Sequence, residues 1–257
     1  MSKRTVFITG AAAGIGKSVA LRMAREGFRV AAFDIDAAGI ERLQSELPSD
    51  AITGILDVRD ADQWQTALDT VSAATGGTLD VLINNAGILR SGKLQEIPLA
   101  DQQLVVEVNV FSVLNGCYLA YPLLKATRGA HVVNMASASA IYGQAELATY
   151  SATKFAVRGY SEALDIEWAD DDIAVSAIWP LFVQTAMTDD MDIASSRKLG
   201  IKLTADDVAS EILKAVNGRS TRVHRGVGLQ SKVMMASSNV SPSRIVRLLN
   251  RNIAKSR

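Results

Sequence analysis

The sequence contains a single cysteine, five prolines, few aromatic residues and no net charge. Cys117 cannot form an internal disulfide, which fits a reducing cytoplasm. No His or Cys has partners at ligand spacing, so we predict no metal site. No apolar stretch approaches the ~20 residues of a membrane span, and the N-terminus leaves no room for a signal peptide. We therefore expect a cytoplasmic protein without a nucleic-acid partner.

The neutral total conceals an uneven distribution of charge. Residues 219–257 contain nine basic and no acidic residues, which leaves 18 basic and 27 acidic residues in the rest of the chain. Ser241 and Pro242 can begin a basic amphipathic helix over about 242–255. Its apolar stripe consists of Ile245, Leu248, Leu249 and Ile253. Packing on the same protein is the favoured role, while an anionic membrane surface or an acidic carrier stays open.

Short β-branched runs alternate with segments of helical apolar spacing. The predicted strands are TVFIT, RVAAFD, AITGILDV, LDVLINNAG, AHVVNMAS and IAVSAIW. Several are apolar on both faces, which is typical of a parallel sheet covered by helices on each side. Parallel strands need crossover helices, so the pattern predicts an α/β fold, a doubly wound Rossmann-type sheet. No linker divides the chain, and we expect one catalytic domain over residues 1–257.

The segment TGAAAGIGKS, Thr9–Ser18, fits two kinds of phosphate-binding loop. A nucleoside-triphosphate loop ends in the same Gly-Lys-Ser, but its first glycine would fall at position 11, where the chain has Ala11. Such a loop needs glycine freedom at its start to wrap phosphates with backbone N–H groups. We therefore interpret Lys17 as a solvated residue on the first helical turn.

A dinucleotide-binding turn fits the same segment better. Gly10 permits the sharp exit from the strand, while Gly14 and Gly16 allow backbone to approach a pyrophosphate at the helix N-terminus. Asp34 ends the second strand, where a carboxylate accepts both ribose hydroxyls and repels a 2′-phosphate. Ile35 offers no positive charge for that phosphate, so we predict NAD rather than NADP. The alternative role for Asp34 is to cap the helix that follows.

Five motifs in order resemble the short-chain dehydrogenase/reductase family over about residues 4–217. They are the glycine segment through Ile15 and Gly16, Asn84-Asn85-Ala86-Gly87, Asn109 in VEVNVFS, Ser137, and Tyr150-Ser151-Ala152-Thr153-Lys154. Ser137 precedes Tyr150 by 13 residues, as the family pattern requires. Each motif alone is weak, but the ordered set is specific.

Tyr150 and Lys154 lie four residues apart in a segment of strong helical spacing, so they share one helix face. An unperturbed tyrosine loses its proton near pH 10. An ammonium about 5 Å away favours the phenolate by ~3 kcal/mol, roughly two pH units. The spacing thus predicts a tyrosine whose pKa is lowered, suited to general acid/base exchange between an alcohol and a ketone.

The resemblance implies roles for the other motif residues. Ser137 would hydrogen-bond the substrate oxygen, Lys154 would also hold the nicotinamide ribose, and Asn109 would support a proton-relaying water chain. The family's cofactor contacts match Gly10, Gly14, Ile15, Gly16, Asp57, Val58, Asn85, Ala86, Gly87, Pro180, Val183 and Thr185, together with Tyr150 and Lys154. Leu181 replaces the usual glycine after Pro180, and residues of about 181–203 match a substrate lid. RVHRGVG is at best a poor version of the family's seventh strand.

These inferences favour an NAD(H)-dependent oxidoreductase that interconverts a secondary alcohol and a ketone on a moderately apolar small molecule. One alternative is an NADPH-dependent 3-oxoacyl-type ketoreductase, which Asp34 disfavours. Another is a non-catalytic dinucleotide-binding regulator, which has no need of the Ser137, Tyr150 and Lys154 set. By resemblance, the helices around 102–126 and 150–169 pair subunits in a homodimer or homotetramer.

Overall fold

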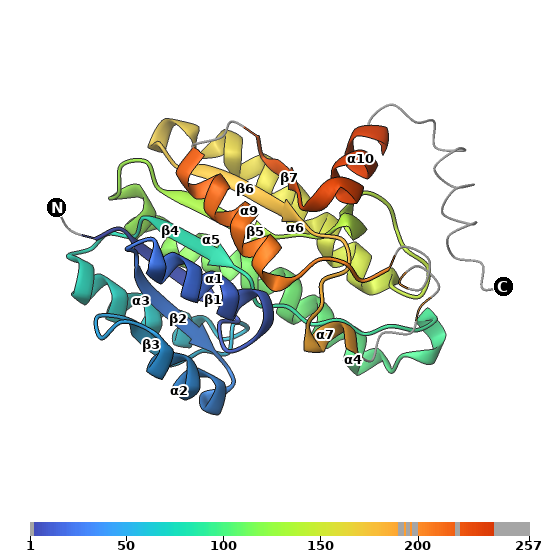
Figure 1. The fold of residues 1–257 in the computed structure, drawn as a ribbon, viewed down its shortest axis with the longest axis horizontal. Coiled ribbons are helices and arrows are strands. Elements are labelled where there is room, and N and C mark those ends of the chain that lie inside the picture. The colour runs from blue at the N-terminus through green and yellow to red at the C-terminus, as the bar shows by residue number, and fades with distance from the viewer. Residues whose placement is uncertain (1–2, 190–192, 194–195, 197–199, 219–221, 239–257) are drawn as a thin grey trace.

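Seven parallel strands form one sheet in the order β3-β2-β1-β4-β5-β6-β7. The computed structural model describes residues 3–189, 193, 196, 200–218 and 222–238. The strands are β1 Thr5–Thr9, β2 Arg29–Asp34, β3 Ile52–Ile55, β4 Val81–Asn84, β5 His131–Met135, β6 Ala174–Trp179 and β7 His224–Gly226. Every pairing is parallel, which confirms the predicted doubly wound Rossmann-type sheet (Figure 1).

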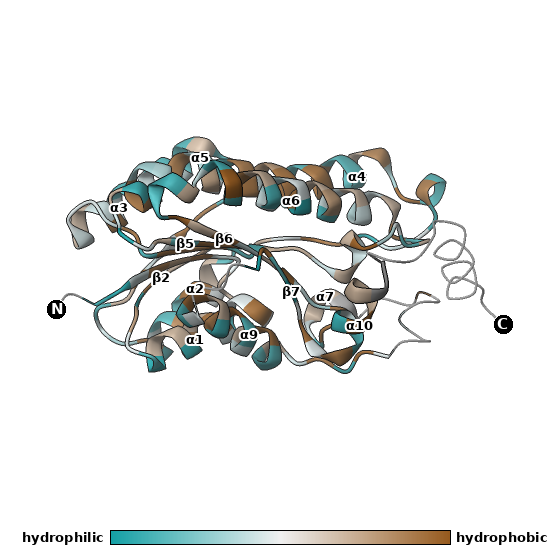
Figure 2. Ribbon diagram, turned by 90° about the horizontal axis from the view of Figure 1, so that it is seen from above, coloured by the Kyte–Doolittle hydropathy of each residue, from teal (hydrophilic) through white to brown (hydrophobic). Residues whose placement is uncertain are grey.

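Helices cover both faces of the sheet (Figure 2). One layer contains α3 Ala61–Thr75, α4 Leu99–Val106, α5 Ser112–Lys125 and α6 Ala148–Glu167. The other contains α1 Gly14–Arg25, α2 Ala37–Glu46, α7 Ala186–Asp189, α9 Ala205–Gly218 and α10 Gly228–Ser238. A π-helical turn, Glu107–Phe111, joins α4 to α5. The predicted helix around 102–126 is therefore interrupted by this turn.

The strands are apolar on both faces because each face packs against a helical layer. In β1, Val6 and Ile8 enter the core beneath α1, α2 and α9, whereas Phe7 enters the core beneath α3, α5 and α6. Phe7 stacks on Phe33 and Trp64, with ring centres 4.7 and 5.3 Å away. Successive side chains of a strand point to opposite faces, so this period of two is the expected signature.

The order of the strands reverses between β1 and β4. From β1 the chain proceeds through β2 and β3 toward one edge, and from β4 through β5, β6 and β7 toward the other. The loops that follow β1 and β4 diverge at this point and leave space at the carboxyl ends of the strands. Asn85 bridges the two strand ends by donating from Nδ2 to the carbonyls of Thr9 at 2.9 Å and Gly10 at 3.0 Å.

Three sequence expectations differ from the structure in detail. β3 and β4 are shorter than the predicted runs, because Leu56-Asp57-Val58 and Asn85-Ala86-Gly87 leave the strands and form loops at the carboxyl edge. The weak seventh strand does form, as three residues paired with β6. The helical run Leu99–Lys125 is long and apolar enough to span a membrane by length and composition, contrary to our expectation. In the fold this run belongs to the helical layer on one sheet face (Figure 2).

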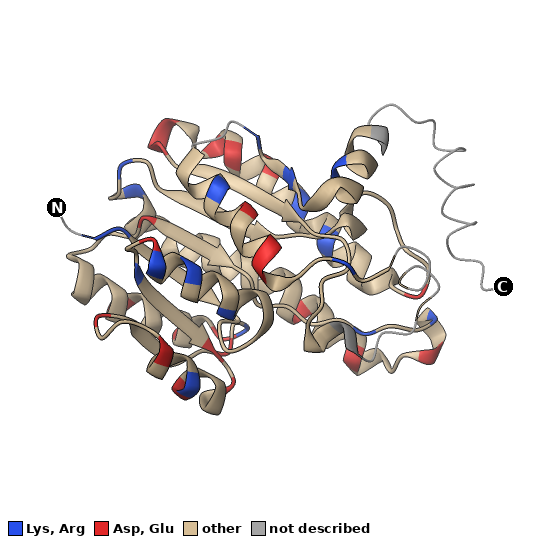
Figure 3. Cartoon of the chain, in the orientation of Figure 1, with Lys and Arg blue, Asp and Glu red and all other residues tan. Residues whose placement is uncertain are grey.

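The described part of the basic segment meets acidic residues of the same chain (Figure 3). Arg225 in β7 forms an ion pair with Glu211 of α9, 3.0 Å apart, and both side chains are largely buried. His224 contacts Glu162 of α6 at 2.8 Å. These contacts account for part of the charge asymmetry within one chain. The predicted helix over 242–255 lies outside the described residues, as do several positions of the predicted lid.

Candidate active site

A cavity of about 550 Å³ lies at the carboxyl ends of the strands, where the strand order reverses. It is bordered by the loops after β1, β2, β3, β4, β5 and β6. Its walls include the predicted residues Gly10, Gly14, Ile15, Asp34, Asp57, Val58, Asn85, Ala86, Gly87, Ser137, Tyr150, Lys154, Pro180, Val183 and Thr185. Segments far apart in the sequence thus converge on one site, and Gly16 and Asn109 are the predicted residues that do not line it.

The glycine loop brings α1 against the end of β1. Gly10 has φ +65°, in the left-handed region that side chains avoid. At Gly16 an added Cβ would lie 2.0 Å from the Gly10 carbonyl oxygen and 2.6 Å from Asn85 Nδ2. Gly16 therefore acts behind the cavity wall, where its missing side chain allows helix and loop to touch.

The N-terminus of α1 faces the cavity with uncapped amides. Its N-cap is Ala13, which provides no side-chain acceptor, and its first turn contains no acidic residue. The first N–H groups of a helix and its dipole together favour an anion at that end. Lys17 forms a surface ion pair with Glu46 at 2.7 Å and does not line the cavity. This position agrees with the interpretation of Lys17 as a surface residue.

Asp34 presents its carboxylate to the cavity from the tip of β2. Its oxygens accept hydrogen bonds from the backbone N–H of Ala12 at 2.9 Å and of Asp36 at 3.0 Å. The N-cap of α2 is Asp36, which accepts from Gly39 N–H at 3.0 Å. The capping alternative for Asp34 is therefore wrong. Ile35, 63% exposed, lies at the same end of the cavity.

The loop after β3 contributes Asp57, Val58 and Arg59 to the cavity wall. Arg59 donates to both oxygens of Asp57, with Nη2 2.6 Å from Oδ2 and Nε 3.0 Å from Oδ1. These hydrogen bonds are the main cause that holds the pKa of Asp57 below its usual value. Sequence reasoning selected Asp57 and Val58 but missed Arg59, whose position two residues after Asp57 was the only signal.

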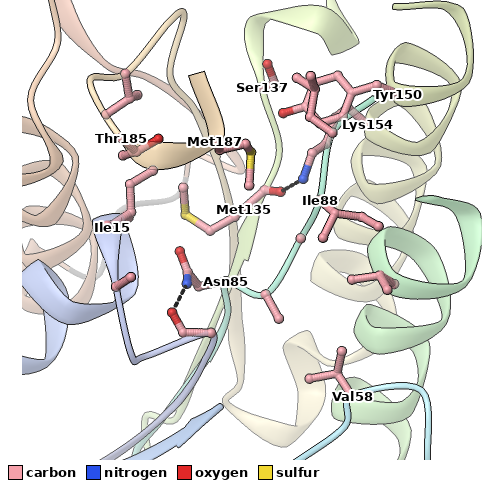
Figure 4. A pocket seen from close by; sticks show the side chains of 18 of the residues that line it. Ile15, Val58, Asn85, Ile88, Met135, Ser137, Tyr150, Lys154, Thr185 and Met187 are labelled. Atoms are coloured by element: carbon pink, nitrogen blue, oxygen red, sulfur yellow. Dashed lines mark hydrogen bonds between the residues drawn. The ribbon is translucent and has the colours of Figure 1, made fainter. Parts of the chain in front are cut away.

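Ser137, Tyr150 and Lys154 lie together on the opposite side of the cavity from Ile15 and Thr185 (Figure 4). Ser137 follows β5, whereas Tyr150 and Lys154 project from the first turns of α6. The Lys154 ammonium donates to the carbonyl of Met135 at 2.8 Å and lies 5.5 Å from the centre of the Tyr150 ring. The helical spacing thus places both side chains on one face, as the sequence predicted.

Burial dominates the proton affinities of this group. It raises the pKa of Tyr150 to about 12, and a hydrogen bond with Ser137 acts in the opposite direction. Burial also lowers the pKa of Lys154 to about 8. The predicted lowering of the Tyr150 pKa is therefore wrong for the protein alone. Transfer of the hydroxyl from water into a low-dielectric wall disfavours the phenolate more than the hydrogen bond with Ser137 favours it.

Ser137 has a buried serine as its neighbour. Its Oγ accepts the backbone N–H of Ser139 at 3.1 Å and lies 3.2 Å from the Ser139 hydroxyl, which also lines the cavity. The Ser137 hydroxyl donates to Ser139 Oγ in this arrangement, and rotation about its C–O bond would turn the proton toward a substrate oxygen or toward Tyr150. Ser139 was not among the predicted residues.

Asn109 is buried behind the cavity, in the π-helical turn. Its amide exchanges two hydrogen bonds with the backbone of Ile88, 2.8 Å at N–H and 2.9 Å at the carbonyl. It also donates to Thr153 Oγ1 at 3.1 Å, and Thr153 donates to the Tyr150 carbonyl at 2.7 Å. Asn109 therefore connects the loop after β4 to the helix that carries Tyr150. Its expected part in a water relay stays a prediction.

The segment after β6 closes the cavity on the side of α7. The Pro180 carbonyl accepts the N–H of Ala138, 2.9 Å away, which ties this segment to the loop of Ser137. Thr185 approaches the glycine loop, where a Cβ on Gly14 would lie 3.3 Å from its methyl group. Leu181, Phe182 and Met187 add apolar surface. The further lining residues that sequence reasoning did not select are Ala13, Leu56, Ile88, Leu89, Arg90, Leu104, Val108, Met135, Ala136, Leu147 and Ala186.

The sheet order and this site define a dinucleotide-binding oxidoreductase fold. The family model of the short chain dehydrogenases matches residues 4–195, about three quarters of the sequence. The chain therefore belongs to the short-chain dehydrogenase/reductase family. It is 34% identical to a 3-oxoacyl-acyl-carrier-protein reductase of Thermotoga maritima, over 86% of this chain and 93% of that protein. It is 33% identical to an L-2,3-butanediol dehydrogenase of Corynebacterium glutamicum, over 93% of this chain and 94% of that protein.

The fold also matches a solved structure of the family over its whole length. A short chain dehydrogenase/reductase from Burkholderia phymatum, solved in complex with NAD, superposes with a TM-score of 0.84. The match covers 100% of this chain and 98% of that one, with 26% sequence identity. The extent of this match establishes the architecture, whereas the chemistry depends on the residues of the site.

Proposed function

We propose that this protein is an NAD(H)-dependent oxidoreductase that interconverts a secondary alcohol and a ketone on a moderately apolar small molecule. The observation that carries the proposal is the shared cavity, which has Asp34 at one end and Ser137, Tyr150 and Lys154 at the other. A carboxylate at the tip of β2 suits ribose hydroxyls, and the three polar side chains suit a reacting oxygen.

The residues present fit a dinucleotide. The uncapped N-terminus of α1 supplies N–H groups for a pyrophosphate, and no acidic side chain in its first turn opposes the anion. At Gly87 an added Cβ would lie 3.2 Å from Asn109 Oδ1, so a side chain there would press on the buried amide that Ile88 contacts. In the proposed complex Pro180, Val183 and Thr185 would contact the nicotinamide end, and Asp57 and Val58 the adenine end.

The cofactor would supply or accept the hydride, and the protein would orient the substrate and exchange the proton. Ser137 would donate a hydrogen bond to the substrate oxygen and stabilise its developing negative charge. Tyr150 would give its hydroxyl proton to that oxygen during reduction and take a proton from the alcohol during oxidation. The Lys154 ammonium would stabilise the phenolate that forms. The raised pKa of Tyr150 keeps this hydroxyl protonated at neutral pH, which suits the direction of reduction.

The apolar part of the cavity supports the class of substrate. Ile88, Leu89, Leu104, Val108, Leu147, Phe182 and Met187 line it. Leu147 and Phe182 belong to an apolar cluster against which Tyr150 packs. A substrate with a hydrocarbon body would therefore displace water from the surroundings of the reacting oxygen.

The ketoreductase alternative shares the catalytic group and differs in the cofactor. The 3-oxoacyl-acyl-carrier-protein reductase of T. maritima makes a carrier-bound substrate worth testing. NADPH is disfavoured because Asp34 and the apolar Ile35 occupy the end of the cavity where a 2′-phosphate would lie. The regulator alternative is disfavoured by the assembled Ser137, Tyr150 and Lys154.

We also propose that the protein is a homo-oligomer that pairs through α5 and α6. Phe111, Leu114, Tyr118 and Phe155 are exposed on or beside these helices, and Tyr118 has 75% of its surface accessible. Phe111, Leu114 and Tyr118 follow helical spacing and share one face. Light scattering after size exclusion would contradict this if the protein runs as a monomer at micromolar concentration.

The decisive experiment is NAD-linked turnover over a panel of secondary alcohols and their ketones, including a carrier-bound 3-oxoacyl thioester. Tyr150→Phe should lose about 100-fold or more of the activity on whichever substrate is turned over. The same variant should still bind NADH, because Lys154 and the other proposed cofactor contacts remain. Full turnover by Tyr150→Phe would remove Tyr150 from the mechanism, and an absence of NAD(H) binding by the wild type would overturn the proposal.

A further inference from the structure

Arg59 differs from an ordinary surface arginine because it forms hydrogen bonds with a carboxylate, that of Asp57, in the wall of the cavity. Asp57 and Arg59 both line the cavity, and the Asp57 side chain is only 19% exposed. The guanidinium donates from Nε to both Asp57 oxygens, at 3.0 and 3.1 Å, and from Nη2 to Oδ2 at 2.6 Å. Such a fork fixes the plane as well as the position of a carboxylate.

A second acid contacts the arginine from the turn between α4 and α5. Arg59 Nη1 lies 3.6 Å from Glu107 Oε2. Glu107 begins the π-helical turn that contains Asn109. Arg59 therefore connects the loop after β3 with the segment that follows α4. The two side chains stay partly open to solvent, with 40% of Arg59 and 45% of Glu107 exposed, so the short contacts of the guanidinium are those with Asp57.

The backbone of this loop does not depend on the Arg59 side chain. The Val58 carbonyl accepts from Trp64 Nε1 at 3.0 Å and from Asn115 Nδ2 at 3.2 Å. The Asp57 N–H donates to Gln63 Oε1 at 2.8 Å. Trp64 is fully buried and anchors the loop to the core. The guanidinium thus orients the Asp57 carboxylate more than it fixes the backbone conformation of the loop.

We propose that Arg59 is a positioning residue for the cofactor, which holds the Asp57 carboxylate where it accepts the 6-amino group of adenine. This inference rests on the proposed function, since it assumes that a dinucleotide occupies the cavity with its adenine beside Asp57. The backbone N–H of Arg59 donates to Asp57 Oδ1 at 3.0 Å and would still hold that oxygen in Arg59→Met. The side-chain fork holds both oxygens and so fixes the plane of the carboxylate before the cofactor binds. Arg59 would therefore raise affinity without touching the reacting atoms.

The test is a thermodynamic cycle in which residue 59 of the protein and the purine base of the cofactor are each changed, alone and together. Wild type, Arg59→Met and Arg59→Lys are titrated with NADH and with nicotinamide hypoxanthine dinucleotide, which lacks the 6-amino group. Arg22→Met is the matched control, because Arg22 forms a similar fork with Asp206, at 2.6 and 2.7 Å, away from the cavity. Thermal melting of each variant measures any loss of folding.

We expect the wild type and Arg22→Met to prefer NADH over the hypoxanthine analogue by about tenfold, the range of a charge-assisted hydrogen bond. Arg59→Met should lose most of that preference, with a higher KM for NADH and an unchanged kcat, and Arg59→Lys should recover part of it. A preference retained in Arg59→Met would overturn the inference and leave the proposed function intact. A wild type that binds neither dinucleotide would overturn the proposed function, and this inference with it.

Discussion

The ammonium of Lys154 lies 5.5 Å from the centre of the Tyr150 ring, one helical turn along α6. The two groups also share a buried environment, which raises the pKa of the tyrosine to about 12 and lowers that of the lysine to about 8. Near neutral pH both therefore hold their protons. The site is charged and poised to donate a proton, and a positively charged nicotinamide would be needed to make the phenolate accessible.

This relationship predicts the pH dependence of ketone reduction. Reduction requires a protonated Tyr150 and a charged Lys154, so kcat should be level below about pH 8. It should fall as the pH rises through the pKa of Lys154, because the ammonium that stabilises the phenolate is lost. Initial rates of NADH oxidation from pH 6 to 10 measure the profile.

The Lys154→Arg variant tests whether titration of Lys154 causes the decline of kcat near pH 8. Its guanidinium keeps its charge over the whole range, so any remaining activity of the variant should lack the decline near pH 8. A decline at the same pH in Lys154→Arg would assign the titration to another group, and a wild-type rate that rises through pH 8 would contradict the prediction.

The carboxylate of Asp34 is predicted to decide between the two nicotinamide dinucleotides. Asp34→Asn removes the charge and keeps an oxygen for the ribose, so NADPH should bind at least about tenfold more tightly than to the wild type. Affinity for NADH should fall, because a neutral amide accepts hydrogen bonds less strongly. Fluorescence titration with both cofactors gives the two dissociation constants.

Asp36 offers a matched control for this variant, since it lies two residues away and caps α2. Asp36→Asn should leave the ratio of the two affinities unchanged. Equal shifts in both variants would point to a general charge effect, and a wild type that prefers NADPH would show that Asp34 does not exclude the 2′-phosphate.

The fold was predictable from the sequence because both of its main signals are local. Continuous apolar runs such as those of β1 and β2 indicate strands that are buried on both faces. The segments of helical spacing between them indicate crossover helices. The ends of strands were less predictable. Leu56, Asp57 and Val58 continue the run of β3 in the sequence but line the cavity in the structure. The seventh strand is short enough to be specified mainly by its partner β6.

Most of the predicted site residues line one cavity, but the electrostatics around Tyr150 differ from the prediction. Spacing placed Lys154 beside Tyr150, whereas the enclosure that raises the Tyr150 pKa depends on the apolar cluster around Leu147 and Phe182, which is built from distant segments. Arg59 was missed for a similar reason. Its partner Glu107 is 48 positions away, and only the folded chain brings their side chains to 3.6 Å.

Gly16 and Gly159 form a contrasting pair of helical glycines. Gly16→Ala should destabilise the protein by about 1–3 kcal/mol and weaken NADH binding, because its Cβ would lie 2.0 Å from the Gly10 carbonyl oxygen and push α1 away from the loop. Gly159 lies inside α6 with nothing within 4 Å of an added Cβ. Gly159→Ala should therefore be neutral or stabilise by about 0.5–1 kcal/mol.

Urea denaturation and NADH titration of both glycine variants check these values. The comparison isolates the close approach of α1 to β1 from the ordinary effect of placing alanine in a helix. Destabilisation of similar size in the two variants would show that the tight packing at Gly16 is not what the loop requires.

The burial of His131 predicts that the free energy of unfolding falls in mild acid. It is buried in β5, where its Nε2 lies 3.0 Å from Ser176 Oγ, and burial lowers its pKa from 6.5 to about 4, with smaller effects from Arg225 and Arg4. Between about pH 6.5 and 4, His131 is therefore protonated in the unfolded chain and neutral in the folded chain. Stability from this group is fully present above pH 6.5 and declines as the pH falls toward 4, by about 2–4 kcal/mol in all.

His131→Gln tests this assignment because the amide is neutral at every pH and can still reach Ser176. Urea denaturation at intervals from pH 7.5 to 4 should give a shallower fall in the free energy of unfolding for His131→Gln than for the wild type. His224→Gln is the control, since His224 faces Glu162 at 2.8 Å near the surface of β7. Parallel curves for the wild type and His131→Gln would show that His131 does not govern acid stability, and the carboxylates held in ion pairs would then have to account for the loss.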